Sequence, residues 1–262
     1  KLPVDPINST TTGEYYTYTP GGSWHLTAFL TSQKHKMGGS ADRSSKDGGS
    51  YPELYETGSN LSLLPISRDP SLVGYWTFDE GSGTIAYDRS GNGNNLTVVD
   101  TLWVNGGLQF NGLTSYVNLP NNIIPQKFSI IFYGLTHSID SNGYNFIIAG
   151  GNTIFALNRN STKFEFFYRS GGIYKRKDFI SSISTNVLYQ LCVTYDGSKF
   201  KLYTNGSFQT SSQELVEIPV SGWYFGKDLN GDRFFEGIIY DFRIYNYTLS
   251  ESEIKAIYDT TK

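Results

Sequence analysis

Two stretches that are far apart in the sequence share an alternation of apolar and polar residues. Residues 72–96 read LVGYWTFDEGSGTIAYDRSGNGNNL, an apolar and aromatic run followed by a Gly-Ser-Gly turn, a second short run and a Gly/Asn-rich loop. Residues 235–246 read FEGIIYDFRIYN, with Asp241 at the centre. Side chains alternate between the two faces of a strand, so both stretches predict strands. We predict that they are the first and last strands of one sheet and that they pair, which closes the domain on itself.

The chain between these strands predicts an all-β fold. Apolar runs recur about every ten residues with turn signals between them, which is typical of a β-sandwich. The chain contains 20 Tyr and 17 Phe, residue types that suit a pleated, half-buried surface. One helix signal follows: Ser250 and Glu253 form a capping box, and Leu249 and Ile254 are spaced as a hydrophobic staple. We therefore expect a short C-terminal helix at 251–258.

The first quarter of the chain forms a separate segment. Within residues 1–66, alternating positions flank a Pro-Gly-Gly turn at 20–22, which predicts a hairpin over 16–30. A single hairpin makes a poor core, so we expect a helix absent from this sequence to pack on it. The polar segment at 67–71 contains a Pro and reads as a linker. Residues 72–262 then form the sandwich domain.

Two sequence blocks in residues 1–66, YTYTPGGSWHLTAFLTSQ and DGGSYPELYETGSNLSLLP, resemble the C-terminal half of a type IV pilin or a type II secretion pseudopilin. Proteins of that family carry a long N-terminal hydrophobic helix that inserts in the membrane and then forms the core of a fibre. The chain begins at Lys1 without an initiator Met, so we expect such a helix to have been removed. The resemblance implies other pilin subunits as partners and membrane contact only through that helix.

Four sequence blocks stand out in residues 72–262: GYWTFDEGSGTIAYDRSGNGN, LQFNGLTSYVNLP, YQLCVTYDGSKFKLYTNG and FFEGIIYDFRIYNYTLSESEI. Together they resemble the laminin-G-like, concanavalin A-like jelly-roll modules. The resemblance implies two antiparallel sheets of six or seven strands, a carbohydrate or protein ligand and, in many relatives, a calcium ion. The chain departs from the family at Asn111, where an Asp is frequent, and at Tyr240, where an acidic residue often precedes Asp241.

A structural calcium ion is the candidate cofactor. Calcium takes six to eight oxygen ligands, often from a loop that contains Gly. Asp88, Asn92 and Asn94 supply such oxygens, and Asp79 and Asp241 come close if the terminal strands pair. The alternative is that Asp88 and the Asn side chains cap turns through hydrogen bonds.

A second acidic loop has Asp228, Asn230 and Asp232 at alternating positions, as at the start of an EF-hand loop. The position that needs a Glu holds Ile239 instead, so a surface turn is the favoured interpretation.

A sugar site needs an exposed aromatic platform beside hydrogen-bonding groups. Tyr144, Tyr168, Tyr174 and Trp223 lie next to predicted loops and are the candidates. The alternative is that these rings belong to the core, which is the expectation for Trp76.

Several function classes are disfavoured. The formal net charge is −3, so we expect no basic surface for binding nucleic acid. The short basic run at 175–177 is expected to lie in a solvated loop or to protect an edge strand from pairing with another chain. The single cysteine, Cys192, permits no internal disulfide and is expected to be a buried thiol. No nucleophile motif or carboxylate pair indicates catalysis.

These observations favour a surface-exposed pilin-like subunit that displays a laminin-G-like module for adhesion to a glycan or protein, in an extracellular or pilus location. Many copies in a fibre would make weak individual binding sufficient. One alternative is a structural pilin whose jelly roll binds no ligand. A weaker alternative is a carbohydrate-active enzyme.

Overall fold

The computed structural model describes residues 16–20, 24–29, 34, 40–41, 54–58, 69–137, 144–150, 155–160, 163–180 and 183–261, and within the strands it leaves out the side chains of 16–20, 24–29, 54–58, 144–145, 155–160 and 180. The chain forms two compact units, Lys1–Asp69 and Pro70–Lys262. The division between them falls inside the predicted linker at 67–71.

The first unit contains a three-stranded antiparallel sheet in the order β1 (Tyr16–Pro20), β2 (Trp24–Phe29) and β3 (Leu54–Gly58). Pro20 of β1 pairs with Trp24 of β2, as the hairpin prediction requires. The third strand pairs with the second, with Phe29 opposite Leu54.

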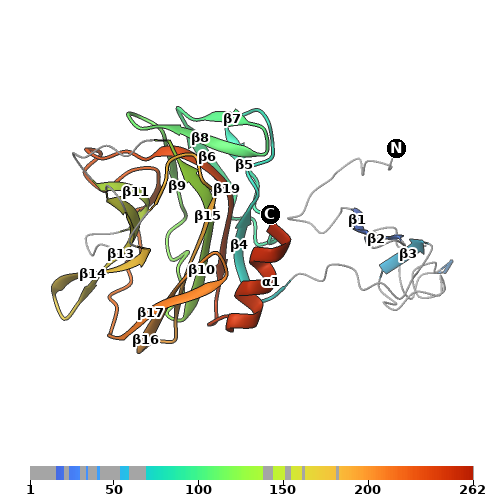
Figure 1. Ribbon diagram of the computed structural model, residues 1–262. Helices are drawn as coiled ribbons and strands as arrows, with labels where there is room; N and C mark the ends of the chain where they lie inside the picture. Colours follow the sequence, from blue (N-terminus) through green and yellow to red (C-terminus); the bar gives the residue numbers. More distant parts are fainter. Residues whose placement is uncertain are drawn as a thin grey trace. The chain divides into compact units, whose positions relative to one another are not determined.

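The second unit is a sandwich of two eight-stranded antiparallel sheets (Figure 1). The order of the first sheet is β17 (Ser207–Gln213), β16 (Lys199–Thr204), β15 (Tyr189–Tyr195), β10 (Phe128–Thr136), β19 (Glu236–Tyr245), β8 (Gly107–Asn111) and β7 (Leu102–Val104), and β4 (Leu72–Trp76) also pairs with β19.

The order of the second sheet is β14 (Ile173–Ile180), β13 (Lys163–Ser170), β12 (Phe155–Asn160), β11 (Tyr144–Gly150), β18 (Trp223–Phe225), β9 (Tyr116–Asn118), β6 (Leu96–Val99) and β5 (Ile85–Ala86).

The predicted pairing of the terminal strands is confirmed. Trp76 of β4 lies opposite Phe242 of β19, and Tyr75 lies opposite Arg243. The other half of the same edge of β19 pairs with β8, where Ile239 lies opposite Leu108. The last long strand therefore holds together two segments from the beginning of the domain, and the all-β jelly-roll prediction is confirmed.

The core lies between the two sheets. It contains Trp76 and Phe242 from the first sheet and Phe166 and Phe225 from the second, all fully buried. The rings of Phe225 and Phe242 meet edge to face across the layers, with centroids 4.4 Å apart. Such aromatic pairs add to the stabilisation that burial of apolar area already gives.

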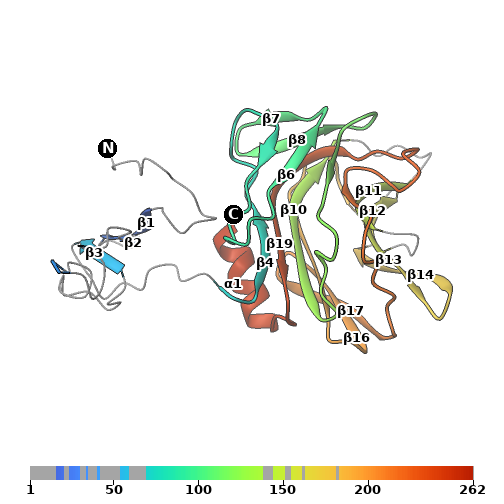
Figure 2. The ribbon, with the colours of Figure 1, turned by 180° about the vertical axis from the view of Figure 1, so that it is seen from behind.

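The predicted C-terminal helix is present as α1 (Glu251–Thr261), and it packs on the outer face of the first sheet (Figures 1 and 2). Its capping box forms: the Ser250 backbone N–H donates to Glu253 Oε2 (2.7 Å), and the Glu253 N–H donates to Ser250 Oγ (3.3 Å). The two staple residues, Leu249 and Ile254, are both buried. The helix thus begins where the sequence predicts and runs slightly further.

The strands β10 and β15 are apolar on both faces because α1 covers their outer side. In β15 the inner positions Leu191 and Val193 face the core, whereas Cys192 between them joins an outer cluster with Ile131, Ile254 and neighbouring residues. The buried-thiol prediction is confirmed, and burial raises the pKa of Cys192. Of the residues that the structure describes, none lies in a helix with the length and hydrophobicity to cross a membrane.

Candidate functional site

A groove on the outer face of the second sheet gathers aromatic and polar side chains. We name it the Tyr174 groove; it encloses about 250 Å³ and is lined by Phe146, Ala149, Gly150, Tyr174, Asp228, Leu229, Asn230 and Arg233. These residues come from β11, from β14 and from the connection between β18 and β19. The groove lies on the side of the sheet that faces away from the core.

The groove is deep over β11 because two small residues, Ala149 and Gly150, line it there. Ala149 offers only a methyl group, and it pairs with Tyr224 of β18. Gly150 pairs with Trp223, and a Cβ built on Gly150 would lie 2.3 Å from a Trp223 ring atom. Packing of the Trp223 ring therefore requires glycine at this position. On the outer face, the short Ala149 side chain therefore leaves the space of the groove.

The Tyr174 ring forms the outer wall of the groove and is 52% exposed. Its position is fixed by two neighbours on the same face of β13. The Phe167 ring lies at 33° to it with centroids 6.2 Å apart, and the Arg169 guanidinium carbon lies 5.6 Å from its centroid. A ring held in this way loses little conformational freedom when a ligand stacks on it.

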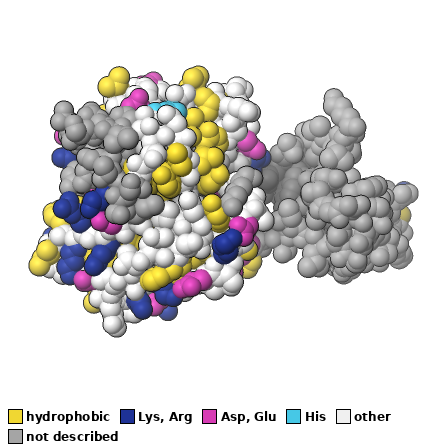
Figure 3. Space-filling model, viewed as in Figure 1, with side chains coloured by type: hydrophobic (Ala, Val, Ile, Leu, Met, Phe, Trp, Pro, Cys, Tyr) yellow, Lys and Arg dark blue, Asp and Glu magenta, His cyan; other side chains and the backbone are white. Residues whose placement is uncertain are grey.

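The hairpin that carries Tyr174 is tied to the chain that follows β17. Lys175 Nζ donates to both oxygens of Glu214 (2.8 and 2.9 Å), and the Gly172 N–H donates to Glu217 Oε1 (2.8 Å). Hydrogen bonds from Lys175 and Ser170 hold the pKa of Glu214 below its usual value. Lys and Arg side chains gather on this side of the sandwich in Figure 3. The run at 175–177 lies on β14, an edge strand of the second sheet, as expected.

The opposite wall of the groove is a tight loop between β18 and β19. A β-bridge joins Lys227 to Phe234, and Asp228 Oδ1 accepts the backbone N–H groups of Asp232 (3.0 Å) and Arg233 (3.4 Å). Asp228 therefore shapes the turn, which is the interpretation that the sequence favoured over an EF-hand. Its role leaves Asn230 and Arg233 to line the groove.

The four predicted aromatic platforms have different outcomes. Tyr174 lines the groove. Tyr168 and Trp223 are each only 1% exposed and belong to the core, so the prediction that they present a ring to a ligand is wrong. Both sit on inward positions of their strands, where Tyr168 packs against Phe166 and Phe200. The side chain of Tyr144 lies outside the described residues.

The Asp88 loop has the geometry of a turn cap, the alternative that the sequence left open. Asp88 Oδ1 accepts the N–H groups of Tyr75 (3.0 Å) and Ser90 (2.9 Å), and Oδ2 accepts that of Asn94 (2.9 Å). The side-chain amides of Asn92 and Asn94 donate to the Val73 carbonyl (3.1 and 2.9 Å). The loop thereby fastens itself to β4 through side-chain and backbone hydrogen bonds.

The other two predicted calcium ligands have protein partners of their own. Asp79 accepts hydrogen bonds from Thr77 (2.6 Å) and Arg89 (3.1 Å), and Asp241 is paired with Arg243. Among the described residues there is no group of three or more His, Cys, Asp or Glu that could hold a metal ion. The calcium ion therefore stays a prediction from the sequence.

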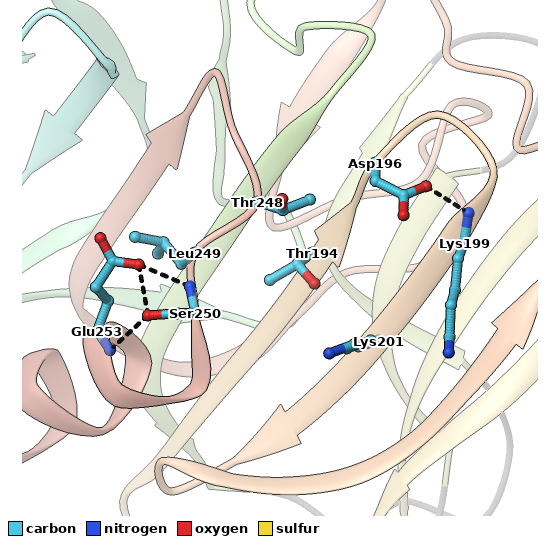
Figure 4. Close-up of a pocket in the computed structure, with 8 residues that line it drawn as sticks. All are labelled: Thr194, Asp196, Lys199, Lys201, Thr248, Leu249, Ser250 and Glu253. Carbon is cyan, nitrogen blue, oxygen red and sulfur yellow. Dashed lines mark hydrogen bonds between the residues drawn. The ribbon is translucent and has the colours of Figure 1, made fainter.

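A second pocket, of about 290 Å³, lies beside the start of α1 and is mostly polar (Figure 4); it is lined by Thr194, Asp196, Lys199, Lys201, Thr248, Leu249, Ser250 and Glu253. Both of its carboxylates already serve the backbone. Glu253 caps the helix, and Asp196 Oδ1 accepts the N–H groups of Ser198 (2.8 Å) and Lys199 (2.7 Å). Its acidic groups therefore organise the start of α1 and a turn, which makes the Tyr174 groove the better candidate for a ligand site.

Sequence reasoning missed most of the groove. Phe146, Arg169 and Arg233 belong to no recognisable motif, and the sequence does not distinguish the outward Phe167 from the inward Tyr168 beside it. The strand KFEFFYRS holds aromatic residues on both faces, so a shift of one residue exchanges the buried and exposed rings. The basic partner Arg169, two residues beyond Phe167, was the signal that marked the outer face.

Comparison with known proteins supports the fold of the second unit. A model of the concanavalin A-like lectin/glucanases superfamily matches residues 110–255. The binding domain of botulinum neurotoxin serotype D is 21% identical, with a TM-score of 0.58 over 72% of this chain and 52% of that chain. The binding domain of Paraclostridial Mosquitocidal Protein 1 is 19% identical, with a TM-score of 0.60 over 74% and 52%. This chain thus spans about half the length of those two binding domains.

Domain 4 of an extracellular arabinanase from Geobacillus stearothermophilus, solved in complex with arabinotriose, is 18% identical, with a TM-score of 0.57 over 71% of this chain and 98% of that chain. At these identities the likeness establishes the fold alone. Among curated proteins, none matches the chain. The pilin resemblance of residues 1–66 receives no support from these comparisons.

Proposed function

Because this chain belongs to the concanavalin A-like lectin/glucanases superfamily, we propose that its second unit is an extracellular binding module. In this proposal the Tyr174 groove takes a glycan, free or attached to a surface protein. The single observation that carries the proposal is the half-exposed Tyr174 ring, held by Phe167 and Arg169 at the wall of a hollow.

The chemistry of the groove suits a sugar. A sugar ring presents an apolar face that packs on an aromatic side chain, and its hydroxyl groups need both donors and acceptors. The groove supplies the Tyr174 ring on one wall, and the Asn230 amide and the Arg233 guanidinium on the other. The arabinanase domain with bound arabinotriose has the same fold, which adds support to a saccharide ligand.

The module is proposed to bind without catalysis. Glycoside hydrolysis generally uses a pair of carboxyl groups that flank the bond to be broken. Of the described residues that line the groove, Asp228 is the only carboxylate, and its Oδ1 is engaged by two backbone N–H groups. This composition argues against the alternative of a carbohydrate-active enzyme.

The test is binding of the purified chain to an array of immobilised glycans. Tyr174→Ala is expected to weaken binding to the glycans that the groove takes by about ten-fold, equivalent to about 1.4 kcal/mol. Tyr87→Ala is the matched control, because Tyr87 is 51% exposed and does not line the groove. Unchanged binding by Tyr174→Ala, or no glycan bound by the parent chain, would refute the proposal.

The wider setting rests on the sequence resemblance of residues 1–66 to pilins. We propose that the first unit anchors the module in a pilus, where repeated copies raise avidity. The reading frame upstream of Lys1 should then encode about 20 apolar residues. Antibodies against the module should also label surface filaments. Unlabelled filaments, or an upstream reading frame without an apolar stretch, would refute the pilus anchoring but not the binding module itself.

Calcium near Asp88 is a separate proposal, which the family resemblance suggests. Binding there requires Asp88 to exchange its backbone hydrogen bonds for the ion. Thermal unfolding with calcium and with EGTA, followed by elemental analysis, tests it. A melting temperature that is several degrees higher in calcium, and that loses this dependence in Asp88→Ala, supports the site; equal melting temperatures and no bound metal refute it.

A further inference from the structure

The outer face of the first sheet carries a second aromatic pocket, on the opposite side of the sandwich from the Tyr174 groove. We name it the tyrosine pocket; it encloses about 400 Å³ and is lined by Tyr75, Gly106, Tyr133, Leu188, Tyr240, Asp241, Arg243, Thr260 and Thr261. It lies at the C-terminal end of α1, since Thr260 and Thr261 belong to the last turn of that helix. The helix covers the sheet up to this point and leaves the tyrosines beside it.

A β-bulge in the last strand creates the pocket. Tyr133 of β10 lies opposite Asp241, but the next residue, Gly134, lies opposite Ile239, so Tyr240 is the extra residue. Ile239 and Phe242 on either side both face the core. Tyr240 and Asp241 therefore both turn outward, where a regular strand would point only one of them. Bulges of this kind re-aim side chains and are frequent beside functional sites.

Glycines make room for the bulge. A Cβ on Gly134 would lie 2.5 Å from the Ile238 carbonyl oxygen, and a Cβ on Gly107 would lie 2.9 Å from the Tyr240 ring. Neither position tolerates a side chain without displacement of its neighbours. The two glycines thus permit the close backbone approach that holds Tyr240 beside Tyr133, whose ring centroid lies 6.4 Å away.

The polar wall of the pocket is fixed and electrically neutral. Arg243 donates through Nε to Asp241 Oδ1 (2.9 Å) and through Nη2 to Oδ2 (2.8 Å). The same Nη2 reaches Tyr75 Oη (3.3 Å) and Thr261 Oγ1 (3.4 Å), and the guanidinium lies 4.4 Å from the centre of the Tyr75 ring. Burial and the nearby Asp241 carboxylate raise the pKa of Tyr75 to about 12, so its hydroxyl stays protonated at neutral pH.

A buried amide lies next to this pocket. Gln190 of β15 pairs across the sheet with Tyr133 and is 1% exposed. Neither its side-chain oxygen nor its side-chain nitrogen has a hydrogen-bond partner within the part of the chain that the structure describes. A buried amide is normally satisfied, because leaving it unpaired is costly. This position therefore has hydrogen-bonding capacity that the protein does not use.

We infer that the tyrosine pocket is a second binding site, for an uncharged saccharide. Tyr75 and Tyr240, both partly exposed, offer ring surface together with hydroxyl groups, and Tyr133, only 8% exposed, backs the Tyr240 ring. Thr260 and Thr261 add two more hydroxyl groups. Among the described residues that line it, only Asp241 and Arg243 are charged, and their charges cancel each other. An anionic ligand would find no uncompensated positive charge there. This site does not depend on the Tyr174 groove, and together the two sites would allow one module to bridge two glycan chains.

The experiment is an NMR titration of the protein labelled with ¹³C in its tyrosine rings, with resonances assigned through single Tyr→Phe variants. The probes are arabinotriose, maltotriose and cellotriose as neutral sugars and sialyllactose as an acidic one. At least one neutral trisaccharide is expected to shift the resonances of Tyr75, Tyr133 and Tyr240 saturably. Tyr240→Ala should raise that dissociation constant by about ten-fold, whereas Tyr87→Ala should leave it unchanged.

The outcomes separate this site from the Tyr174 groove. Shifts confined to Tyr174 would overturn the second site and leave the first, and shifts confined to the tyrosine pocket would do the reverse. Shifts at neither site, or shifts with sialyllactose alone, overturn the inference of a neutral saccharide site. Saturable shifts that persist unchanged in Tyr240→Ala overturn it as well, because the probe would then bind elsewhere.

Discussion

The two sheets of the sandwich have similar inner faces and different outer faces. The outer face of the first sheet is covered in part by α1, which buries Ile131 and Cys192 beneath Ile254. The described outer face of the second sheet carries Tyr174, Arg169 and Arg176, which remain partly exposed. The covered face contains a buried ion pair, whereas the open face contains ion pairs in contact with solvent. The same kind of contact therefore occurs at different burial within one domain.

This difference indicates how the module divides its tasks. Substitutions on the covered face are expected to destabilise the fold more than those on the open face. On the covered face, loss of a buried apolar contact or of one partner of a buried ion pair lowers the free energy of unfolding by several kcal/mol. Solvent contact lets the open face vary at little cost to folding, as a binding surface requires. The tyrosine pocket lies at the boundary, where the helix ends and the covered face becomes accessible. Substitutions matched between the two faces test this division.

The largest effect is expected at the buried ion pair. Arg243→Ala removes the partner of Asp241, whose side chain is 7% exposed. Burial raises the pKa of Asp241 and Arg243 opposes that rise, so the variant leaves a carboxyl group that is costly to ionise. We expect a loss of about 3–5 kcal/mol in the free energy of unfolding at pH 7, measured by urea denaturation. A loss below 1 kcal/mol would contradict the role assigned to burial.

Removal of the helix contact is expected to have the next largest effect. Ile254 is fully buried, and Ile254→Ala should cost about 2–5 kcal/mol. The variant should also loosen α1, so Cys192 should react faster with a thiol reagent than in the parent chain, where the thiol is buried with a raised pKa. Leu113→Ala is the control, because Leu113 is 73% exposed. Equal rates of Cys192 labelling in the two variants would show that α1 does not shield the thiol.

The sequence predicted the covered face better than the open face, for physical reasons. The capping box at Ser250 follows from local hydrogen bonding between neighbouring residues. Apolar patterns along the chain predict the pairing of β4 with β19 and the burial of Cys192. The sequence displays both kinds of signal directly. The groove instead depends on which face each aromatic residue occupies. In β13, a shift of one residue along the strand moves each side chain to the other face. The sequence prediction therefore placed Tyr168 at the surface, where the structure has Phe167.

The tyrosine pocket was also beyond the sequence, because it depends on a bulge. Alternation along FEGIIYDFRIYN gives no sign that Tyr240 is an extra residue, and only the pairing with β10 reveals it. Asp241 was predicted as a calcium ligand because the terminal strands were expected to pair and bring it close to the Asp88 loop. Arg243 lies two residues further along the same strand, on the same face, and it is the partner that the Asp241 carboxylate takes.

A moderate effect is expected at the helix cap, and it depends on pH. Ser250→Ala should cost about 0.5–2 kcal/mol at pH 7. Hydrogen bonds from Ser250 lower the pKa of Glu253 below its ordinary value of 4.5. A carboxyl group with a lowered pKa stabilises the fold above 4.5, and that contribution disappears as the pH falls through the folded-state pKa. The difference between the parent chain and Ser250→Ala should therefore be smaller at pH 3 than at pH 7 in urea denaturation; an equal or larger difference would contradict this account.

The smallest effect is expected at Lys175 on the edge strand β14, and it makes the comparison between buried and exposed ion pairs quantitative. Lys175 lies 2.8 Å from Glu214, the same separation as between Arg243 and Asp241, but the Lys175 side chain is 37% exposed and that of Arg243 is 16% exposed. Water solvates the Glu214 carboxylate when its partner is removed, so Lys175→Ala should cost only about 0.2–1 kcal/mol. The cost should also shrink as salt is added, because exposed pairs are screened. A cost equal to that of Arg243→Ala would mean that contact distance, and not burial, sets the energy of these pairs.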